Sequence, residues 1–253
     1  MLTKYFCNIT GQYFTLDNQA LGREKSYKFG FTSRDRAVIY CLMQKLGINT
    51  LPLNSFSNKN IIGIGMSDNH YLSRILSQSF SYINTFFHQS PYLDIYNTQH
   101  ISQYTDLDFI ICSDVFEHIS PYPGLHIAFQ HLYRMLKKNT GVLIFSVPYN
   151  TTEHKEHFPS LYDYHIVAEN TKYTLHNTTY NGRKEQFTNL CFHDGPGETL
   201  EMRQFSQDSI IQYLEKAGFK NITFHNITED MKRFGIIWEY PTSLIVTGNV
   251  SNV

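Results

Sequence analysis

Hydrophobic positions along the chain alternate between short runs typical of strands and longer stretches with helical spacing. Strands are predicted over residues 60–65, 80–87, 108–112 and 142–147. Helical spacing of apolar residues predicts helices over 33–46, from 71 onward, and from 125 to 136. Strands that alternate with helices in this way indicate a parallel sheet covered by helices, so the predicted fold class is α/β.

Candidate caps and two late strands complete the pattern. Ser33 is a possible N-cap of the first helix, and Ser206 and Gly218 bracket a helix over 206–217. Strands are predicted after it over 221–227 and 243–247. Two strands after a final helix suggest an antiparallel edge to an otherwise mostly parallel sheet.

Between residues 149 and 205 the chain is rich in His, Asn, Tyr and Gly and shows no sustained periodicity. Loops of this length in a compact domain are usually functional. The segment follows the carboxyl end of a predicted sheet strand, which is where ligands bind in open α/β folds. We therefore divide the chain into an N-terminal segment, 1–32, and a domain, 33–253, that carries a substrate-binding insertion at 149–205.

Composition narrows the functional classes. Apolar residues make up 42% of the 253 residues, enough for a sizeable core. Lys and Arg number 21 against 22 for Asp and Glu, so there is no net basic field and nucleic-acid binding is disfavoured. Without a run of about 18 apolar residues no membrane span is predicted, and four widely spaced cysteines suit reduced thiols in a cytoplasmic protein.

Polar residues and glycines gather at two predicted strand ends. Segment 61–68 reads IIGIGMSD and has two glycines that allow close approach of a ligand to the backbone. Segment 106–118 reads DLDFIICSDVFEH, and segment 132–148 reads LYRMLKKNTGVLIFSVP. In these two segments an acidic strand end, a helix and a further strand follow one another.

Residues 60–147 carry these motifs and resemble class I S-adenosylmethionine-dependent methyltransferases, which implies a Rossmann-like fold and that cofactor. Segments 156–159 (EHFP), 192–195 (FHDG) and 198–205 (ETLEMRQF) resemble a subgroup associated with polysaccharide biosynthesis. The resemblance implies cofactor contacts from Gly63, Gly65, Met66, Ser67, Asp68, Asn84, Thr85, Asp94, Ile95, Ser113, Asp114 and Val115.

The residues at each strand end are expected to contact a different part of the cofactor. The resemblance places residues 65–68 by the methionine, Asp94 and Ile95 by the adenine, and residues 113–115 on the floor of the site. Two positions depart from the family. Gly63 stands where the family has an acid, and Asn84 or Thr85 replaces the acid that binds the ribose, although an amide or hydroxyl can still hydrogen-bond a diol.

Related chains begin with two C-x-x-C pairs before an SRxRA segment, which is SRDRA at 33–37 here. The four cysteine positions correspond to Cys7, Thr10, Ser26 and Phe29, so only one thiolate remains. Because structural zinc needs four N, S or O ligands, we expect a degenerate ribbon without zinc. Packing of aromatic side chains would hold it instead, those of Tyr5, Phe14, Tyr27, Phe29 and Phe31.

Methyl transfer to a hydroxyl requires a base that removes the proton as the new bond forms. Candidates are His118, His157 and His193, and each is alternatively a surface or hydrogen-bonding histidine. Substrate contacts are predicted from Tyr149, Glu198, Glu201 and Arg203, with Tyr162 and Tyr164 as further pocket walls, although the charges are equally compatible with internal pairing. No metal is predicted, because no ligand spacing is diagnostic; the alternative is a divalent ion that orients two sugar hydroxyls.

Together these features predict a methyltransferase that acts on a small-molecule or saccharide substrate. The preferred acceptor is a hydroxyl of a sugar or nucleotide-sugar precursor of a surface polysaccharide. One alternative is methylation of a small phosphorylated metabolite or a protein side chain, the former favoured by a positive pocket around Arg183, Lys184 and Arg203. The other is a non-catalytic cofactor-binding or scaffold protein, motivated by the departures at Gly63 and Asn84.

Overall fold

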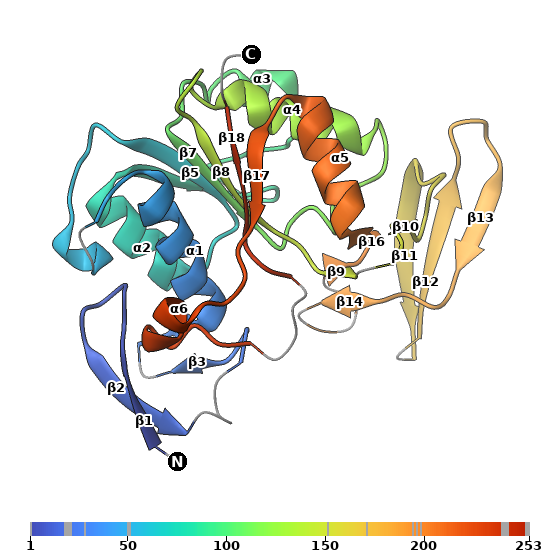
Figure 1. The fold of residues 1–253 in the computed structure, drawn as a ribbon. Coiled ribbons are helices and arrows are strands. Elements are labelled where there is room, and N and C mark those ends of the chain that lie inside the picture. Colours follow the sequence, from blue (N-terminus) through green and yellow to red (C-terminus); the bar gives the residue numbers. More distant parts are fainter. Residues whose placement is uncertain are drawn as a thin grey trace.

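A six-stranded sheet forms the centre of the molecule, with helices on both faces (Figure 1). The computed structural model describes residues 2–17, 22–27, 29–49, 52–150, 152–170, 172–193, 195, 197, 199–238 and 243–250. The strand order is β17-β18-β8-β7-β5-β6. Neighbours among β6, β5, β7 and β8 are parallel, whereas β18 runs antiparallel to both β8 and β17. The predicted α/β class and antiparallel edge are confirmed.

The central strands are β5 (Ile62–Met66), β6 (Ser81–Thr85), β7 (Phe109–Ser113), β8 (Val142–Ser146), β17 (Lys220–Phe224) and β18 (Val246–Asn249). The helices are α1 (Ser33–Lys45), α2 (His70–Ser79), α3 (Thr98–Ile101), α4 (Leu125–Met135), α5 (Gln207–Ala217) and α6 (Glu229–Arg233), with a 3-10 turn at Leu53–Ser55. Each predicted central strand is present, and most ends differ from the prediction by one to three residues.

Two hydrophobic cores lie on opposite faces of this sheet. Alternate residues of β7 point to different cores: Ile110 joins the core with α4 and α5, and Ile111 joins the core with α1 and α2. Burial on both faces explains why β7 and β8 are apolar almost throughout. The sequence therefore marks them clearly, and their polar carboxyl ends stand out.

Helix caps follow the predictions with one correction. Ser206 accepts a hydrogen bond from Ser209 N, and Gly218 ends α5 with a φ of 111°. The prediction of Ser33 as N-cap is wrong, because the preceding Thr32 caps α1. Thr32 Oγ1 accepts from Asp35 N at 3.0 Å while the Asp35 carboxylate accepts from Thr32 N at 2.8 Å, a capping box that fixes the start of the helix.

The insertion forms a sheet of its own, contrary to the expected irregular loop. An antiparallel sheet of β11 (Asp163–Glu169), β12 (Lys172–Thr178) and β13 (Lys184–Phe187) extends beside the central domain (Figure 1). Its small core contains Phe158, Leu161, Leu175, Leu200 and Met202. Most residues of β11 and β12 are polar or at least partly exposed. Too few apolar positions remain for the alternating pattern of a strand to be recognised in the sequence.

Short strand pairs connect the insertion to the central domain. They are β9 (Tyr149–Asn150), β10 (Lys155–Glu156), β14 (Phe192–His193), β15 (Thr199–Leu200) and β16 (Arg203–Ser206). Strand β16 lies between β10 and β9, and β14 pairs with β15 as a hairpin. These pairings bring residues 199–206 close to the end of β7, since Met202 N donates to Glu117 O at 2.7 Å.

The N-terminal segment forms two hairpins on α1, with strands β1 (Leu2–Phe6), β2 (Tyr13–Asp17), β3 (Ser26–Tyr27) and β4 (Phe31–Thr32). Tyr5, Phe14 and Phe31 are buried in the same core as α1. The Phe14 and Phe29 rings meet edge to face, 6.4 Å between centroids. The side chain of Tyr27, also expected here, lies outside the described residues.

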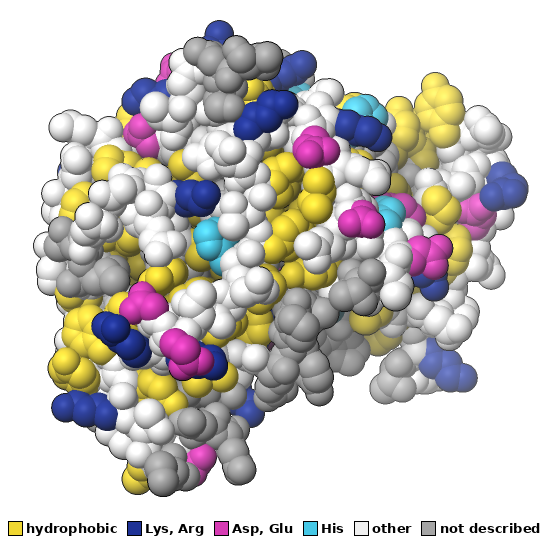
Figure 2. All heavy atoms as spheres, in the orientation of Figure 1, with side chains coloured by type: hydrophobic (Ala, Val, Ile, Leu, Met, Phe, Trp, Pro, Cys, Tyr) yellow, Lys and Arg dark blue, Asp and Glu magenta, His cyan; other side chains and the backbone are white. Residues whose placement is uncertain are grey.

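Among the described residues, basic and acidic side chains are interspersed on the face drawn in Figure 2. No helix in the described part of the chain has both the length and the apolar character needed to cross a bilayer. Three of the four free cysteines are buried, and Cys191 is exposed.

Candidate functional site

The carboxyl ends of β5, β6 and β7 meet at one edge of the sheet. Ser67, directly after β5, has a φ of 61°, a conformation that favours glycine and turns the chain sharply toward α2. The two residues at the end of β6 hydrogen-bond inward to this turn. Asn84 accepts from Asp68 N at 3.0 Å and donates to Asp68 O at 2.7 Å, and Thr85 Oγ1 donates to Gly65 O at 2.8 Å. Both side chains therefore support the β5 turn.

The glycines of β5 allow side chains from neighbouring strands to fill their space. A Cβ atom on Gly63 would lie 2.3 Å from the Phe109 ring, and one on Gly65 would lie 1.8 Å from Tyr82 Oη. Met66 is buried in the core with α4. A side chain at either position would displace these neighbours, and at Gly63 the Phe109 ring occupies the space that the family's acid would need.

Asp68 lies beside Gly65 and accepts a hydrogen bond from Tyr82 Oη. Burial raises the pKa of the Asp68 carboxyl from 3.8 to about 7, although the bond from Tyr82 acts in the opposite direction. The folded protein therefore holds a proton on Asp68 in a range where the unfolded chain has released it.

Asp68 should consequently make the protein less stable as the pH rises. Its contribution is fully present below about pH 4 and is lost as the pH rises through about 7, because the unfolded state binds fewer protons in that interval. In Asp68→Asn we expect a smaller fall in unfolding free energy between pH 4 and 8 than in the wild type, measured by urea denaturation. Parallel pH profiles for the two proteins would contradict this assignment.

At the end of β7, Asp114 is held by two arginines from the N-terminal part of the chain. Arg23 donates through both terminal nitrogens, at 2.8 and 2.7 Å, and Arg34 Nη1 lies 3.3 Å from Asp114 Oδ2. Ser146 Oγ donates to Asp114 Oδ1 at 3.0 Å. Burial alone would raise the pKa of Asp114, but the two guanidinium groups outweigh it and lower it to about 2.

The adjoining residues complete this edge. Arg34 Nη1 also donates to Ser113 Oγ at 3.0 Å, and Val115 packs partly buried on the core with α4. Asp94 Oδ1 accepts from Tyr96 N at 2.9 Å, and Ile95 is buried in the same core. The two residues expected near an adenine thus lie in a tight turn, and Ile95 anchors this turn in the hydrophobic core.

The three histidines singled out from the sequence lie in one network. His118 Nε2 and His193 Nδ1 are 3.2 Å apart, and His193 Nε2 lies 3.0 Å from Glu201 Oε2. His157 Nε2 lies 2.8 Å from the other oxygen of Glu201. Residues far apart in the sequence are brought together by the β14–β15 hairpin and by the bond from His157 N to Met202 O.

Glu117 and His118 form the end of this network that is closest to β7. The Glu117 side chain has no exposed surface, and His118 Nε2 lies 3.7 Å from Glu117 Oε1. Burial, with the nearby Asp114 carboxylate, raises the pKa of Glu117 well above its usual range. Burial lowers the pKa of His118, although its bond to the Leu200 carbonyl acts in the opposite direction.

The remaining predicted substrate residues are placed differently from the expectation. The Arg203 side chain is fully buried and donates to Glu156 Oε1 at 2.6 Å and to the Phe116 carbonyl, so it joins β16 and β10 to the segment after β7. Tyr149 is buried against Phe224. Neither side chain lines the two pockets given below, and Glu198 lies outside the described residues.

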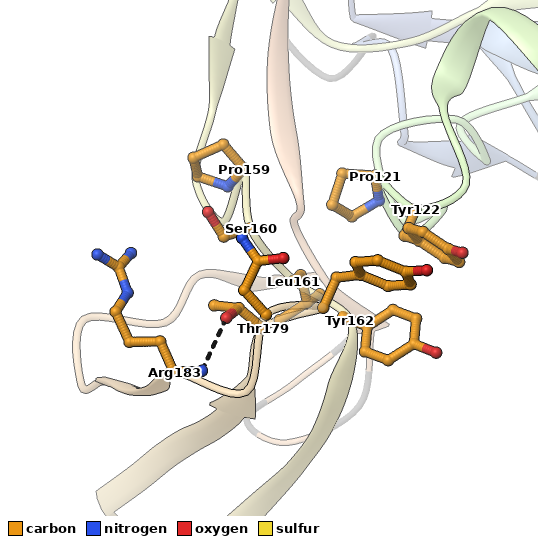
Figure 3. A pocket seen from close by; sticks show the side chains of 10 residues that line it. Pro121, Tyr122, Pro159, Ser160, Leu161, Tyr162, Thr179 and Arg183 are labelled. Atoms are coloured by element: carbon orange, nitrogen blue, oxygen red, sulfur yellow. Dashed lines mark hydrogen bonds between the residues drawn. The ribbon is translucent and has the colours of Figure 1, made fainter.

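Two pockets lie in or beside the insertion, and one of them is lined by residues of the histidine network. One, of about 420 Å³, is lined by His157, Glu201 and Cys191 together with residues of β13 and the loop after it. The other, of about 470 Å³, includes Tyr122, Tyr162 and Tyr180 (Figure 3). Tyr122 and Tyr162 lie on one side of this pocket, and the Arg183 side chain extends on the other. The three tyrosine rings pack with centroids 4.7 to 6.1 Å apart.

A mostly parallel sheet with polar groups at its carboxyl edge is the Rossmann-like architecture of enzymes that bind nucleoside cofactors. A family described as a methyltransferase domain matches residues 45–223. The chain belongs to this family: it is a methyltransferase, and S-adenosylmethionine is its cofactor. The family match favours the enzyme over the non-catalytic alternative.

Solved structures of methyltransferases are similar at low identity. An S-adenosylmethionine-dependent methyltransferase from Clostridium acetobutylicum is 13% identical, with 88% of this chain and 91% of that chain covered and a TM-score of 0.47. A sugar N-methyltransferase from a Streptoalloteichus species is 8% identical, with 85% and 86% covered and a TM-score of 0.46. Phosphoethanolamine N-methyltransferase 2 from Haemonchus contortus is 11% identical, with 78% and 40% covered and a TM-score of 0.37. A search of curated proteins gives no significant match.

Two buried side-chain nitrogens lie close to the arginine pair that holds Asp114. Arg23 Nε and Trp238 Nε1 have no hydrogen-bond partner in the described part of the chain, and the Arg23 guanidinium carbon lies 6.0 Å from the centre of the Trp238 ring. Buried donors of this kind are costly unless an acceptor reaches them.

Sequence reasoning missed Arg23, Trp238, Glu117, Tyr122 and Tyr180. Glu117 could have been identified from the sequence, because it immediately precedes His118 in the segment that follows the apolar strand. Tyr122 follows the same strand by nine residues. Arg23 and Trp238 lie far from any motif, and only the folded chain brings them to β7.

Proposed function

We propose that the acceptor is a hydroxyl group of a sugar or nucleotide sugar, of the kind used to build a surface polysaccharide. The observation that carries this proposal is the tyrosine pocket of the insertion, which accompanies a second pocket lined by the base candidate His157. Sugar rings have apolar C–H faces that pack on aromatic rings and hydroxyls that bond polar groups. Arg183, which also lines the tyrosine pocket, pairs with Glu185, and this arrangement favours a neutral ring over a phosphate there.

For the cofactor we propose the sheet edge from β6 to β7. Arg23 and Trp238 would bind the methionine carboxylate, Ser67 and Asp68 would lie beside the methionine, and Asp94 and Ile95 would flank the adenine. Ser113, Asp114 and Val115 would form the floor. When bound, S-adenosylmethionine supplies an electrophilic methyl group whose carbon–sulfur bond breaks with its electron pair kept by sulfur.

Among the three candidate histidines, His157 is the one that lines a pocket, and we propose it as the base. Glu201 accepts the Nε2 proton of His157, which leaves a lone pair on Nδ1. That nitrogen takes the proton of the acceptor hydroxyl as the oxygen bonds to the methyl carbon. Glu201, bonded to His193 as well, holds the resulting imidazolium by charge.

Incubation of the protein with S-adenosylmethionine and a panel of nucleotide sugars tests the acceptor class. We expect a sugar product heavier by one methylene, detected by mass spectrometry. Tyr162→Ala should raise KM for that acceptor about tenfold with a smaller change in kcat, since it removes packing area from the ground state and transition state alike. Tyr71→Ala, on an exposed tyrosine of α2, is the control.

Methylation confined to phosphorylated metabolites without a sugar would refute the proposal. Equal KM values for Tyr162→Ala and Tyr71→Ala would place the sugar outside the tyrosine pocket.

A further inference from the structure

Three side chains, two from the segment after β7 and one from β14, converge on one point. They are Glu117, His118 and His193, whose nearest ligand atoms all lie within 4.8 Å of one another. Both Glu117 oxygens are buried, and neither has a hydrogen-bond partner among the described residues. A fully buried, unpartnered carboxylate is costly in a folded protein.

The hydrogen bonds that His118 and His193 make to Leu200 and Glu201 determine which of their ring nitrogens carry protons. The Leu200 carbonyl can only accept, so the 2.8 Å bond places a proton on His118 Nδ1. The Glu201 carboxylate likewise places a proton on His193 Nε2. In their neutral forms, His118 Nε2 and His193 Nδ1 therefore direct lone pairs toward each other at 3.2 Å.

We infer that a divalent transition-metal ion of the zinc type binds between Glu117, His118 and His193. A cation would attract the lone pairs of the two histidine nitrogens and would favour the ionised form of Glu117 as the third ligand. Ligands bonded to zinc at its usual distances in a tetrahedron lie roughly 3.3 Å apart. The observed separations from His118 Nε2 are 3.2 Å to His193 Nδ1 and 3.7 Å to Glu117 Oε1.

The outer hydrogen bonds are also those of a metal site. Metal-binding histidines usually donate their second N–H to a carboxylate or a backbone carbonyl, which orients the ring. His193 does so to Glu201 and His118 to Leu200. Two histidines and one carboxylate, with open positions left over, are typical ligands of a catalytic first-row metal ion.

The metal ion would assist the proposed base, His157, by making the acceptor hydroxyl more acidic. Resting on the proposed function, this inference places an acceptor hydroxyl oxygen in an open coordination position, where the ion makes its proton more acidic. Glu201 then connects the metal ligand His193 to the base His157. The ion changes no oxidation state, and the hydroxyl proton leaves to His157.

A second set of ligand atoms, on Cys191, His193 and Glu201, is the competing location. It would use His193 Nε2 and break the bonds that Glu201 makes to the histidines. It also leaves Glu117 without a partner, so the first set accounts for more of the structure.

The test is zinc binding by the full chain after treatment with a chelator, followed by calorimetric titration and elemental analysis. We expect one zinc per chain, little effect of Mg²⁺, which prefers oxygen ligands, and a zinc-dependent rise in melting temperature. Glu117→Gln and His193→Ala should each weaken zinc binding by at least about 100-fold, because each removes a direct ligand. Glu117→Gln preserves shape, and the partly exposed His193 provides a second variant that should fold.

Two variants serve as matched controls. His176→Ala removes a histidine that faces another, His165, on the insertion sheet, and Cys191→Ser tests the competing location. Both should bind zinc as the wild type does. The inference is overturned if the wild type binds no zinc. It is also overturned if a control variant loses zinc binding while Glu117→Gln and His193→Ala retain it. Because the readout needs no acceptor, zinc binding without sugar methylation would count against the proposed function alone, and the reverse against the metal site alone.

Discussion

Replacing His157 with alanine is expected to lower the methyl-transfer turnover number by about 100- to 10,000-fold, the range that a positioned base contributes. Affinity for S-adenosylhomocysteine should stay nearly the same, because His157 belongs to the insertion. It lines a pocket beside β13, whereas the cofactor is proposed to bind at the edge of the central sheet. Turnover is measured with the best nucleotide-sugar acceptor, and affinity by calorimetry. The pair of readouts separates chemistry from cofactor binding.

His165→Ala is the appropriate control, since His165 lies on β11 and stacks on His176 across the insertion sheet. It should retain wild-type turnover. If His157→Ala kept its turnover, or lost cofactor affinity to the same extent as turnover, the base assignment would be wrong.

The largest expected effect on stability comes from Arg203→Met. Methionine fills a similar volume but leaves the Phe116 carbonyl without the Arg203 donor and the partly buried Glu156 carboxylate with His154 as its remaining partner. Breaking a buried pair from one side costs about 3–5 kcal/mol. Chemical denaturation of both proteins at one pH measures the difference.

Arg183→Met provides the matched comparison, because Arg183 also pairs with a glutamate, Glu185, but is 72% exposed. Its unfolding free energy should change by no more than about 0.5–1 kcal/mol. Similar losses in the two variants would show that burial of Arg203 does not determine its contribution.

Local signals made the central domain predictable from the sequence. Strands β7 and β8 are buried on both faces, so their apolar runs are continuous, and α5 carries both caps at the expected residues. The insertion was not predictable in this way. Its strands bury few residues on one small core, and Leu175 is the one buried apolar residue of β12.

The candidate site was predicted as separate residues and not as an arrangement. His118, His157 and His193 come from three segments, and their connection through Glu201 depends on the pairing of Phe192 with Leu200 in the β14–β15 hairpin. Motif positions gave no sign that Asn84 and Thr85 turn inward to support the β5 turn. Long-range pairing of this kind leaves no periodicity in the sequence.

Calorimetric titration with S-adenosylhomocysteine most directly tests whether the sheet edge holds the cofactor. The wild type should bind one equivalent in the micromolar range. Asp94→Ala and Arg23→Ala should each weaken that binding at least about tenfold, the loss expected when a polar contact to the ligand is removed. If the wild type gives no binding heat at high micromolar ligand, or if both variants bind as it does, the cofactor does not occupy the edge formed by β5, β6 and β7.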